Sequence, residues 1–343
     1  MLQLSVLDQS TVCTGRTPAS SIQETLALAR HCEDAGYRRY WLAEHHNSAS
    51  QAGTAPEVLM AAVAATTRRI RVGSAGVMLP HYSALKVAEV FRVLEAIAPG
   101  RIDMGLGRAP GSDGLTAYAL NPAADTAADQ FPAAVRDLLA WVSGRPLQDG
   151  HPFTAVSAQP AGPGWPEPWI LGSSTYGAQV AAYFGLPYCF AHFITDGRGA
   201  DEALDAYRSL YRPSERCPEP HAALAVWAMA CETEAEADRQ FASRALWRLG
   251  RDRGVYAPLP SPDEAAAYPW SEAERTRAAR LRETALVGAS AVVGGQLRRL
   301  ATAHDVEEIA VLTTVHDPAV RRRSYSLLAD AVAGTPAQLA RIA

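Results

Sequence analysis

The chain of 343 residues has little lysine, few cysteines and no long apolar run. Lys86 is the only lysine, and the other basic residues are arginines scattered along the chain. The formal net charge of −4 argues against a basic surface for nucleic acid or for an anionic membrane. The densest basic run is 321–323, and a solvated helix face accounts for it.

The five cysteines are odd in number, and none belongs to a C-x-x-C pair. This usage argues against a disulfide framework and against a zinc ribbon, and reduced thiols in the cytosol fit it best. The N-terminal MLQLSVLDQS has neither a basic stretch nor a long apolar core, and no segment holds eighteen uninterrupted apolar residues. We therefore expect a cytoplasmic protein that is not targeted to a membrane.

Apolar and helical segments alternate along the chain in a way that predicts an α/β fold. Strands are expected at 2–7, 40–43, 70–79, 101–106, 169–171, 188–193, 222–231 and 309–313, and helices at 21–36, 56–67, 83–98, 132–142, 176–184, 200–211, 234–249, 291–303 and 318–332. The first helix is expected to begin at a capping box formed by Ser21 and Glu24 and to end at Gly36.

Eight strands, each followed by a helix, indicate a (β/α)8 TIM barrel formed by a single domain of residues 1–343. Two stretches break the alternation: a Pro/Gly-rich insertion or hairpin at 145–168, and a proline-interrupted, charged segment at 251–285. The length also allows two medium domains, and a doubly wound sheet is the alternative architecture.

Residues 41–48, WLAEHHNS, join a short apolar run to an acid and two histidines. Three titratable groups in succession are costly to bury unpaired. In a barrel, Glu44, His45 and His46 would follow the second strand at its carboxyl end, where barrel enzymes carry their active groups. Other strand ends supply Asp8, Gln9 and Ser10, then Ala75, Gly76 and Val77 ahead of Pro80, His81 and Tyr82, and finally Gly107 and Arg108.

Two loops at this end of the predicted barrel have the composition of phosphate-binding loops. Gly107 to Gly111 offers backbone N–H groups and the guanidinium of Arg108. The second loop places amides and hydroxyls at a helix N-terminus, through Gly172, Ser173, Ser174 and Tyr176. Two such loops on consecutive strands suggest one phosphate between them, although each alone also reads as an ordinary turn or a serine-rich helix cap.

The adjacent histidines do not suggest a metal site, because neighbouring side chains diverge and chelating pairs favour H-x-H or H-x-x-x-H spacing. Both histidines could be functional, or one could pack under the loop while the other faces the pocket. The glycine loop is one residue longer than the dinucleotide fingerprint, which makes it poor support for NAD.

Together these residues resemble the bacterial-luciferase-like, flavin-dependent monooxygenases over nearly the whole chain. The resemblance is carried by WLAEHH at 41–46, RIRVGSAGVMLPHYSALKVAE at 69–89, PGRIDMGLGRAPGSD at 99–113, LGSS at 171–174 and FGLPYCFAHF at 184–193. Within the family the chain is most similar to an actinobacterial branch that includes oxygenases of aromatic polyketide antibiotic pathways, such as that of mensacarcin.

The resemblance implies a barrel that binds FMN, as FMNH2, at its carboxyl-terminal mouth. By its match to the family motif, His45 would be the catalytic histidine near the flavin edge. Ala75–Gly76 would carry a non-prolyl cis peptide under the isoalloxazine ring. Arg108 would hold the phosphate, with help from Ser173 and the amides near Tyr176.

The implied reaction uses O2 as co-substrate and forms a flavin C4a-hydroperoxide that oxygenates an apolar, aromatic polyketide-like substrate. A separate NAD(P)H:flavin reductase would supply reduced flavin, and the family suggests a homodimer. Asp8 and His81 are candidates for substrate contact. Residues 251–285, with Tyr256 and Trp270, are a candidate closing lid, or else a surface insertion.

Three other functions stay open on the sequence. The same barrel serves F420-dependent hydride-transfer enzymes, some relatives are non-catalytic flavin-binding proteins, and a sugar-phosphate lyase or isomerase would need no flavin. The loop after the fifth strand has Gly172 where luciferase has an acid. This difference argues against light emission from an aldehyde as the native role.

Overall fold

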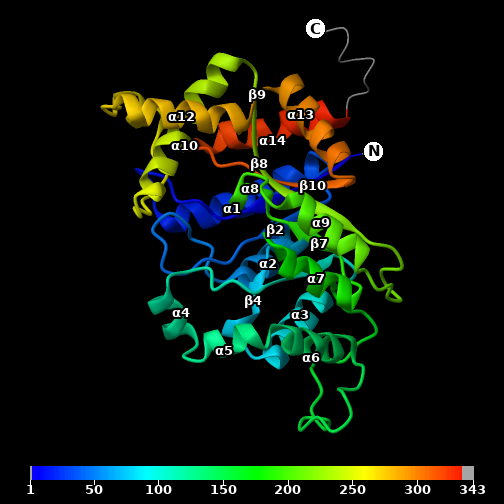
Figure 1. The fold of residues 1–343 in the computed structure, drawn as a ribbon. Coiled ribbons are helices and arrows are strands. Elements are labelled where there is room, and N and C mark those ends of the chain that lie inside the picture. The colour runs from blue at the N-terminus through cyan, green and yellow to red at the C-terminus, as the bar shows by residue number, and fades with distance from the viewer. Residues whose placement is uncertain (1, 334–343) are drawn as a thin grey trace.

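The computed structural model describes residues 2–333, which form a closed barrel of eight parallel strands surrounded by helices (Figure 1). The barrel strands are β1 (Gln3–Asp8), β2 (Arg39–Leu42), β3 (Arg71–Ser74), β5 (Ile102–Gly107), β6 (Glu167–Gly172), β7 (Tyr188–Phe190), β8 (Ala222–Cys231) and β10 (Glu308–Leu312). Strand β10 pairs in parallel with both β1 and β8, which closes the barrel. The predicted (β/α)8 TIM barrel is confirmed.

The main helices follow these strands in chain order and pack on the outside of the barrel. They are α1 (Pro18–Asp34), α2 (Pro56–Thr66), α3 (Ala84–Ile97), α6 (Phe131–Ser143), α7 (Thr175–Phe184), α9 (Ala200–Ser209), α10 (Glu234–Asp252), α13 (Ser290–Ala303) and α14 (Pro318–Ala333). The other helical elements are the short η1 (Leu79–His81), α4 (Gly114–Leu120), α5 (Ala124–Asp129), α8 (His192–Thr195) and α11 (Pro262–Ala267), and the longer α12 (Glu272–Thr284).

Several predicted boundaries were wrong. Helix α1 begins three residues before the predicted capping box, because Thr17 caps it by accepting from the Ser20 N–H and Pro18 occupies its first turn. The predicted strand at 188–193 ends at Phe190, where the chain turns into α8. The expected strand at 70–79 is interrupted between β3 and the two-residue β4 (Val77–Met78), which pairs with β5.

Both insertions lie outside the alternation of strands and helices. Residues 145–168 form an irregular excursion that extends away below α6 in Figure 1 and holds no strand before β6. Residues 251–285 contain α11 and α12. They lead into an additional strand, β9 (Leu286–Ala289), which pairs with the outer half of the long β8. The sequence did not predict β9, because its four residues are too short for a recognisable pattern.

Strand residues alternate between the helix layer and the barrel lumen. Tyr40 and Leu42 pack with the helices, whereas Trp41 points into the lumen and meets Trp169 with ring centroids 5.0 Å apart. Gly73 leaves room for the Trp41 ring, because a Cβ there would lie 2.7 Å from it. A Cβ at Gly105 would lie 2.0 Å from the Ser74 carbonyl oxygen, so the neighbouring backbone approaches closely there.

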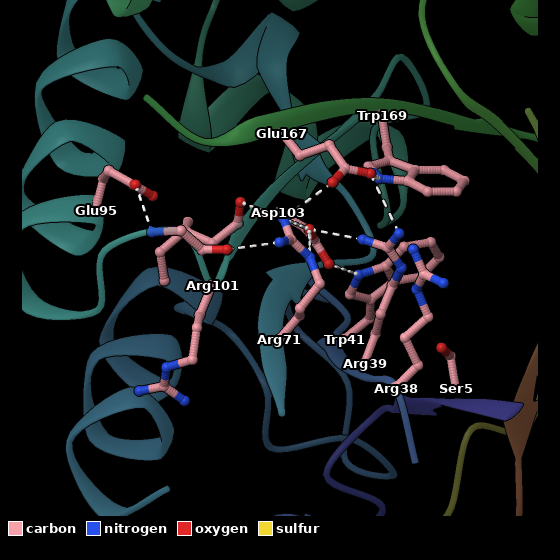
Figure 2. Close-up of polar contacts among 12 residues, drawn as sticks. Ser5, Arg38, Arg39, Trp41, Arg71, Glu95, Arg101, Asp103, Glu167 and Trp169 are labelled. Atoms are coloured by element: carbon pink, nitrogen blue, oxygen red, sulfur yellow. Dashed lines mark hydrogen bonds and ion pairs between the residues drawn. The ribbon is translucent and has the colours of Figure 1, made fainter. Parts of the chain in front are cut away.

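The amino-terminal end of the lumen is filled by a charged network centred on the fully buried Arg39 (Figure 2). Its guanidinium donates to Asp103 at 2.8 Å and to Glu308 at 2.9 Å, and contacts Glu167 at 3.2 Å. The Trp41 indole N–H also donates to Asp103. Because charges and tryptophans fill the lower lumen, the free space of the barrel lies at its carboxyl end.

Candidate active site

A cavity of about 650 Å³ opens at the carboxyl ends of the barrel strands. Every barrel strand contributes to its wall, through Leu7, Ala43, Ala75, Gly107, Leu171, Ala191, Ala225 and Leu312 among others. These residues are small or aliphatic. They line the cavity on the carboxyl side of the Trp41–Trp169 pair. The cavity lies where TIM-barrel enzymes carry their active sites.

The loop after β3 presents Ala75 and Gly76 to this cavity. The peptide bond between them is cis, as predicted. A Cβ at Gly76 would lie 2.8 Å from the backbone of Gly105 on the neighbouring strand, so only glycine fits there without a shift. Backbone therefore forms this part of the wall, where a flat ligand could approach closely.

The loops after β5 and β6 meet at the cavity as the sequence predicted. Arg108, Gly172, Ser173, Ser174 and Tyr176 all line it. The Arg108 guanidinium lies over the Tyr176 ring, 4.2 Å from its centroid. Ser174 caps α7 without a side-chain hydrogen bond, which leaves its hydroxyl and the first amides of the helix available. We call this set, Arg108 with residues 172–174 and Tyr176, the anion cradle.

The segment Glu44-His45-His46 divides into structural and cavity-facing parts. The buried Glu44 accepts hydrogen bonds from His46 Nε2 at 2.8 Å, from the Tyr82 hydroxyl at 2.6 Å and from the Met78 N–H at 3.0 Å. It thereby joins the loops after β2 and β3. His46 is held by this acid, whereas His45 lines the cavity. Of the two interpretations left open, the structure matches the one with a single packed histidine.

His45 has a buried Nδ1 atom with no hydrogen-bond partner among the described residues. Burial and the nearby positive charge of Arg251 lower the pKa of His45 to about 4. The imidazole is therefore neutral at physiological pH, with one nitrogen to donate and one to accept. A side chain that lines a cavity and keeps a buried nitrogen unpaired is a candidate for a ligand contact.

One face of α10 forms a cavity wall that the sequence did not predict. Arg244, Trp247, Arg248 and Arg251 line it from successive turns, at spacings of three and four residues. This spacing was visible in RALWRLGR at 244–251, but it also describes an exposed charged face. Only the burial of Arg244, which is 8% exposed, separates the two.

Of the four remaining predicted site residues, only one lines the cavity. Tyr256 lines the cavity, whereas Asp8, His81 and Trp270 do not. Asp8 accepts from Arg321 at 2.8 Å and from Tyr40 at 2.6 Å; burial alone would raise its pKa, but these partners hold it below the usual value. His81 Nε2 bonds the Pro110 carbonyl, and the Trp270 indole donates to the Ala265 carbonyl.

No cluster of three or more His, Cys, Asp or Glu suited to a metal ion occurs in the part of the chain that the structure describes. Within residues 2–333, no helix is both long and apolar enough to cross a membrane. All five cysteines are free thiols.

Comparison with known proteins identifies the class to which this fold and cavity belong. The sequence model of the luciferase-like monooxygenase family matches residues 2–309. The chain therefore belongs to the luciferase-like monooxygenase family, as the motifs at 41–46 and 99–113 suggested.

Individual relatives match over almost their full length. The uncharacterized protein YwcH of Bacillus subtilis is 42% identical over 334 residues, which cover 97% of this chain and 100% of that protein. The N-acetyl-S-alkylcysteine monooxygenase of the same organism is 36% identical over 335 residues, covering 97% and 98%. Among solved structures, apo-MsnO8 is 39% identical with a TM-score of 0.88, covering 98% of this chain and 100% of its own.

Proposed function

We propose that this protein is a two-component flavin monooxygenase that uses FMNH2 and O2 to oxygenate an apolar, aromatic polyketide-like substrate. One observation carries the proposal: the anion cradle, the Ala75–Gly76 backbone and His45, whose buried Nδ1 is unpaired, all line one cavity. They come from the ends of β5 and β6, of β3 and of β2, so a single flavin could contact all three. Membership of the luciferase-like monooxygenase family supports the same reaction class.

The cavity fits FMN by the chemistry of its donors. Arg108 and the first turn of α7, with Ser173 and Ser174, would hold the phosphate, while the backbone at Ala75–Gly76 would lie against the flat ring. When bound, reduced flavin supplies the two electrons that activate O2, so that one oxygen atom enters the substrate and the other leaves as water.

His45 is the proposed catalytic residue. Its neutral ring can place a proton on Nδ1 or leave that atom as an acceptor, and no other described side chain competes for it. Phe193, Trp227 and Trp247 supply an apolar wall that would exclude water from the reacting atoms. The same wall supports an aromatic substrate, and the relative named for N-acetyl-S-alkylcysteine adds sulfur oxygenation as a second reaction to assay.

The proposal includes two partners and a lid. A separate NAD(P)H:flavin reductase would deliver FMNH2. The whole chain would form one domain, so the reductase would be a different protein.

A homodimer is supported by exposed apolar side chains on neighbouring helices, namely Val58 of α2 with Val93 and Ile97 of α3. Within the candidate lid at 251–285, Tyr256 faces the cavity and would close over it, while the half-buried Trp270 would anchor α11. The free thiols fit the expected cytoplasmic compartment.

Rapid mixing of photoreduced FMN and the protein with oxygenated buffer tests the reaction class. We expect oxidised-flavin absorbance to return more slowly than with free FMNH2, because the cavity shields the reacting flavin. The His45→Ala variant should bind FMN normally, yet its oxidised-flavin absorbance should return at a rate close to that of free FMNH2. If the wild-type protein does not delay the return even when saturating, the monooxygenase proposal fails. Mass spectrometry of the bound cofactor would then test F420-dependent hydride transfer, and tight FMN without product would indicate a flavin-binding protein.

A further inference from the structure

Four arginines are buried in the described chain: Arg39, Arg92, Arg244 and Arg321. Arg39 and Arg321 are paired with acids, and Arg92 donates to the carbonyl oxygens of Val142 and Pro160. Among residues 2–333, no acid or carbonyl oxygen lies within bonding distance of the Arg244 guanidinium. Since an unpaired buried charge is costly, the donors of Arg244 are suited to a ligand.

The surroundings of Arg244 fix its orientation but do not neutralise it. Its guanidinium carbon lies 3.8 Å from the centroid of the Trp227 ring, so one face of the group is covered and its N–H edge is left for a partner. Burial and the neighbouring Arg248 lower the pKa of Arg244 to about 9, so the group stays charged at neutral pH. Asp196, whose charge opposes this lowering, contacts Arg248 at 3.7 Å.

This positive wall is separate from the anion cradle. Helix α10 follows β8, whereas the cradle follows β5 and β6, and β7 lies between β6 and β8 in the sheet. Arg251, one turn beyond Arg248, lines the same cavity as His45, and its charge contributes to the lowered pKa of that histidine. The arginine face therefore borders the space next to the proposed catalytic residue. FMN has a single phosphate, which the cradle already accounts for.

We propose that the substrate carries a carboxylate on an aromatic or apolar body, and that Arg244 binds this carboxylate. A carboxylate is the planar anion whose two oxygens match the free edge of a guanidinium. Trp227, Trp247 and Phe193 would contact the apolar body. The inference rests on the proposed function, because it assigns the cradle to the flavin and the α10 wall to the substrate.

Matched acid and amide probes test this assignment. We would titrate 3-phenylpropanoate, 6-phenylhexanoate and their amides into the whole protein, with and without FMN, and follow tryptophan fluorescence. We expect the wild-type protein to bind each acid roughly tenfold more tightly than its amide, as for a hydrogen bond to a charged group. Arg244→Met should abolish this preference, and Arg244→Lys should retain only part of it, because lysine lacks the planar fork.

Arg216→Met is the matched control. Arg216 also lies 3.8 Å from a tryptophan centroid, that of Trp165, but near the amino end of β6, outside the cavity. This variant should keep the wild-type preference. Replacing an unpaired buried charge with an apolar side chain of similar volume should not unfold the protein, and thermal melts of all three variants check this.

Three results would overturn the inference. Equal binding of acid and amide by the wild-type protein is the first, and an acid preference that survives in Arg244→Met is the second. The third is a loss of affinity for FMN but not for riboflavin in Arg244→Met, since Arg244 would then hold the flavin phosphate while the proposed function stands. Conversely, a wild-type protein that binds no FMN but still prefers acids would refute the proposed function and support the carboxylate site.

Discussion

The Arg108 guanidinium carbon lies 4.2 Å from the ring centroid of Tyr176, across the gap between the loops after β5 and β6. The contact holds an exposed arginine beside the first turn of α7, where an anion would bind. Arg108→Ala should therefore weaken FMN binding by about 2 kcal/mol, or roughly thirtyfold. Riboflavin, which has no phosphate, should bind as before, and fluorescence titration of both flavins checks this. Equal weakening of the two would assign Arg108 a structural role.

Acid should destabilise the protein through His45. Its pKa is lowered from 6.5 to about 4, so between these values the unfolded chain takes up a proton that the folded chain does not. Stability therefore rises with pH across this window and is lost as the pH falls through it, by about 2 kcal/mol at about pH 5. Urea unfolding near neutral pH and at about pH 5 measures the loss. In the His45→Asn variant, the loss of unfolding free energy between neutral pH and about pH 5 should be smaller by about 2 kcal/mol. If the variant loses as much stability as the wild-type protein, His45 is not the titrating group.

Glu44 should matter more for stability than its position beside two histidines suggests. Glu44→Ala removes the acceptor of three hydrogen bonds and leaves the buried Met78 N–H unpaired, which should cost about 3 kcal/mol. Tyr82→Phe removes one of these bonds and should cost about 1 kcal/mol. Denaturant unfolding of both variants gives the comparison. Equal costs would mean that Glu44 does not hold the two loops together.

Arg38 and Arg39 are adjacent arginines with very different surroundings. Arg39→Met would remove a buried ion-pair partner from both Asp103 and Glu308 and should cost about 4 kcal/mol. The Arg38 side chain is 39% exposed and lies 3.7 Å from Glu308, so Arg38→Met should cost less than about 1 kcal/mol. Thermal and urea unfolding measure both. Similar costs would contradict a structural role for the network in Figure 2.

The sequence predicted the barrel because strands buried on both faces are continuous apolar runs, as in residues 40–43 and 222–231. It did not predict α4 and α5, whose few residues are mostly exposed and show no apolar stripe. It also missed β9, which depends on the outer half of β8 as its partner. Such elements are fixed by tertiary contacts, which local patterns do not contain.

The sequence predicted the cavity-lining residues His45, Arg108 and Ser173, because each follows the end of a predicted strand and so lies at the carboxyl end of the barrel. The end of a strand does not by itself place the side chain of Asp8, because a one-residue shift along a strand reverses the direction of the side chain. Leu7 faces the cavity, so Asp8 points outward to Tyr40 and Arg321. The arginines of α10 were missed for a different reason, since their charge suggested solvent and only the packed structure buries Arg244.

The filled lower lumen has a consequence for the order of events in turnover. In the described part of the chain, the fully buried Arg39, Trp41 and Trp169 pack together and close the barrel beneath the cavity. In the proposed function, flavin, substrate and product would all use the opening at the carboxyl ends of the strands. Whichever molecule lies deeper has to wait for the one above it to leave. Binding and release would therefore be ordered. The residence time of the outermost molecule would limit the rate at which oxidised flavin is replaced by reduced flavin.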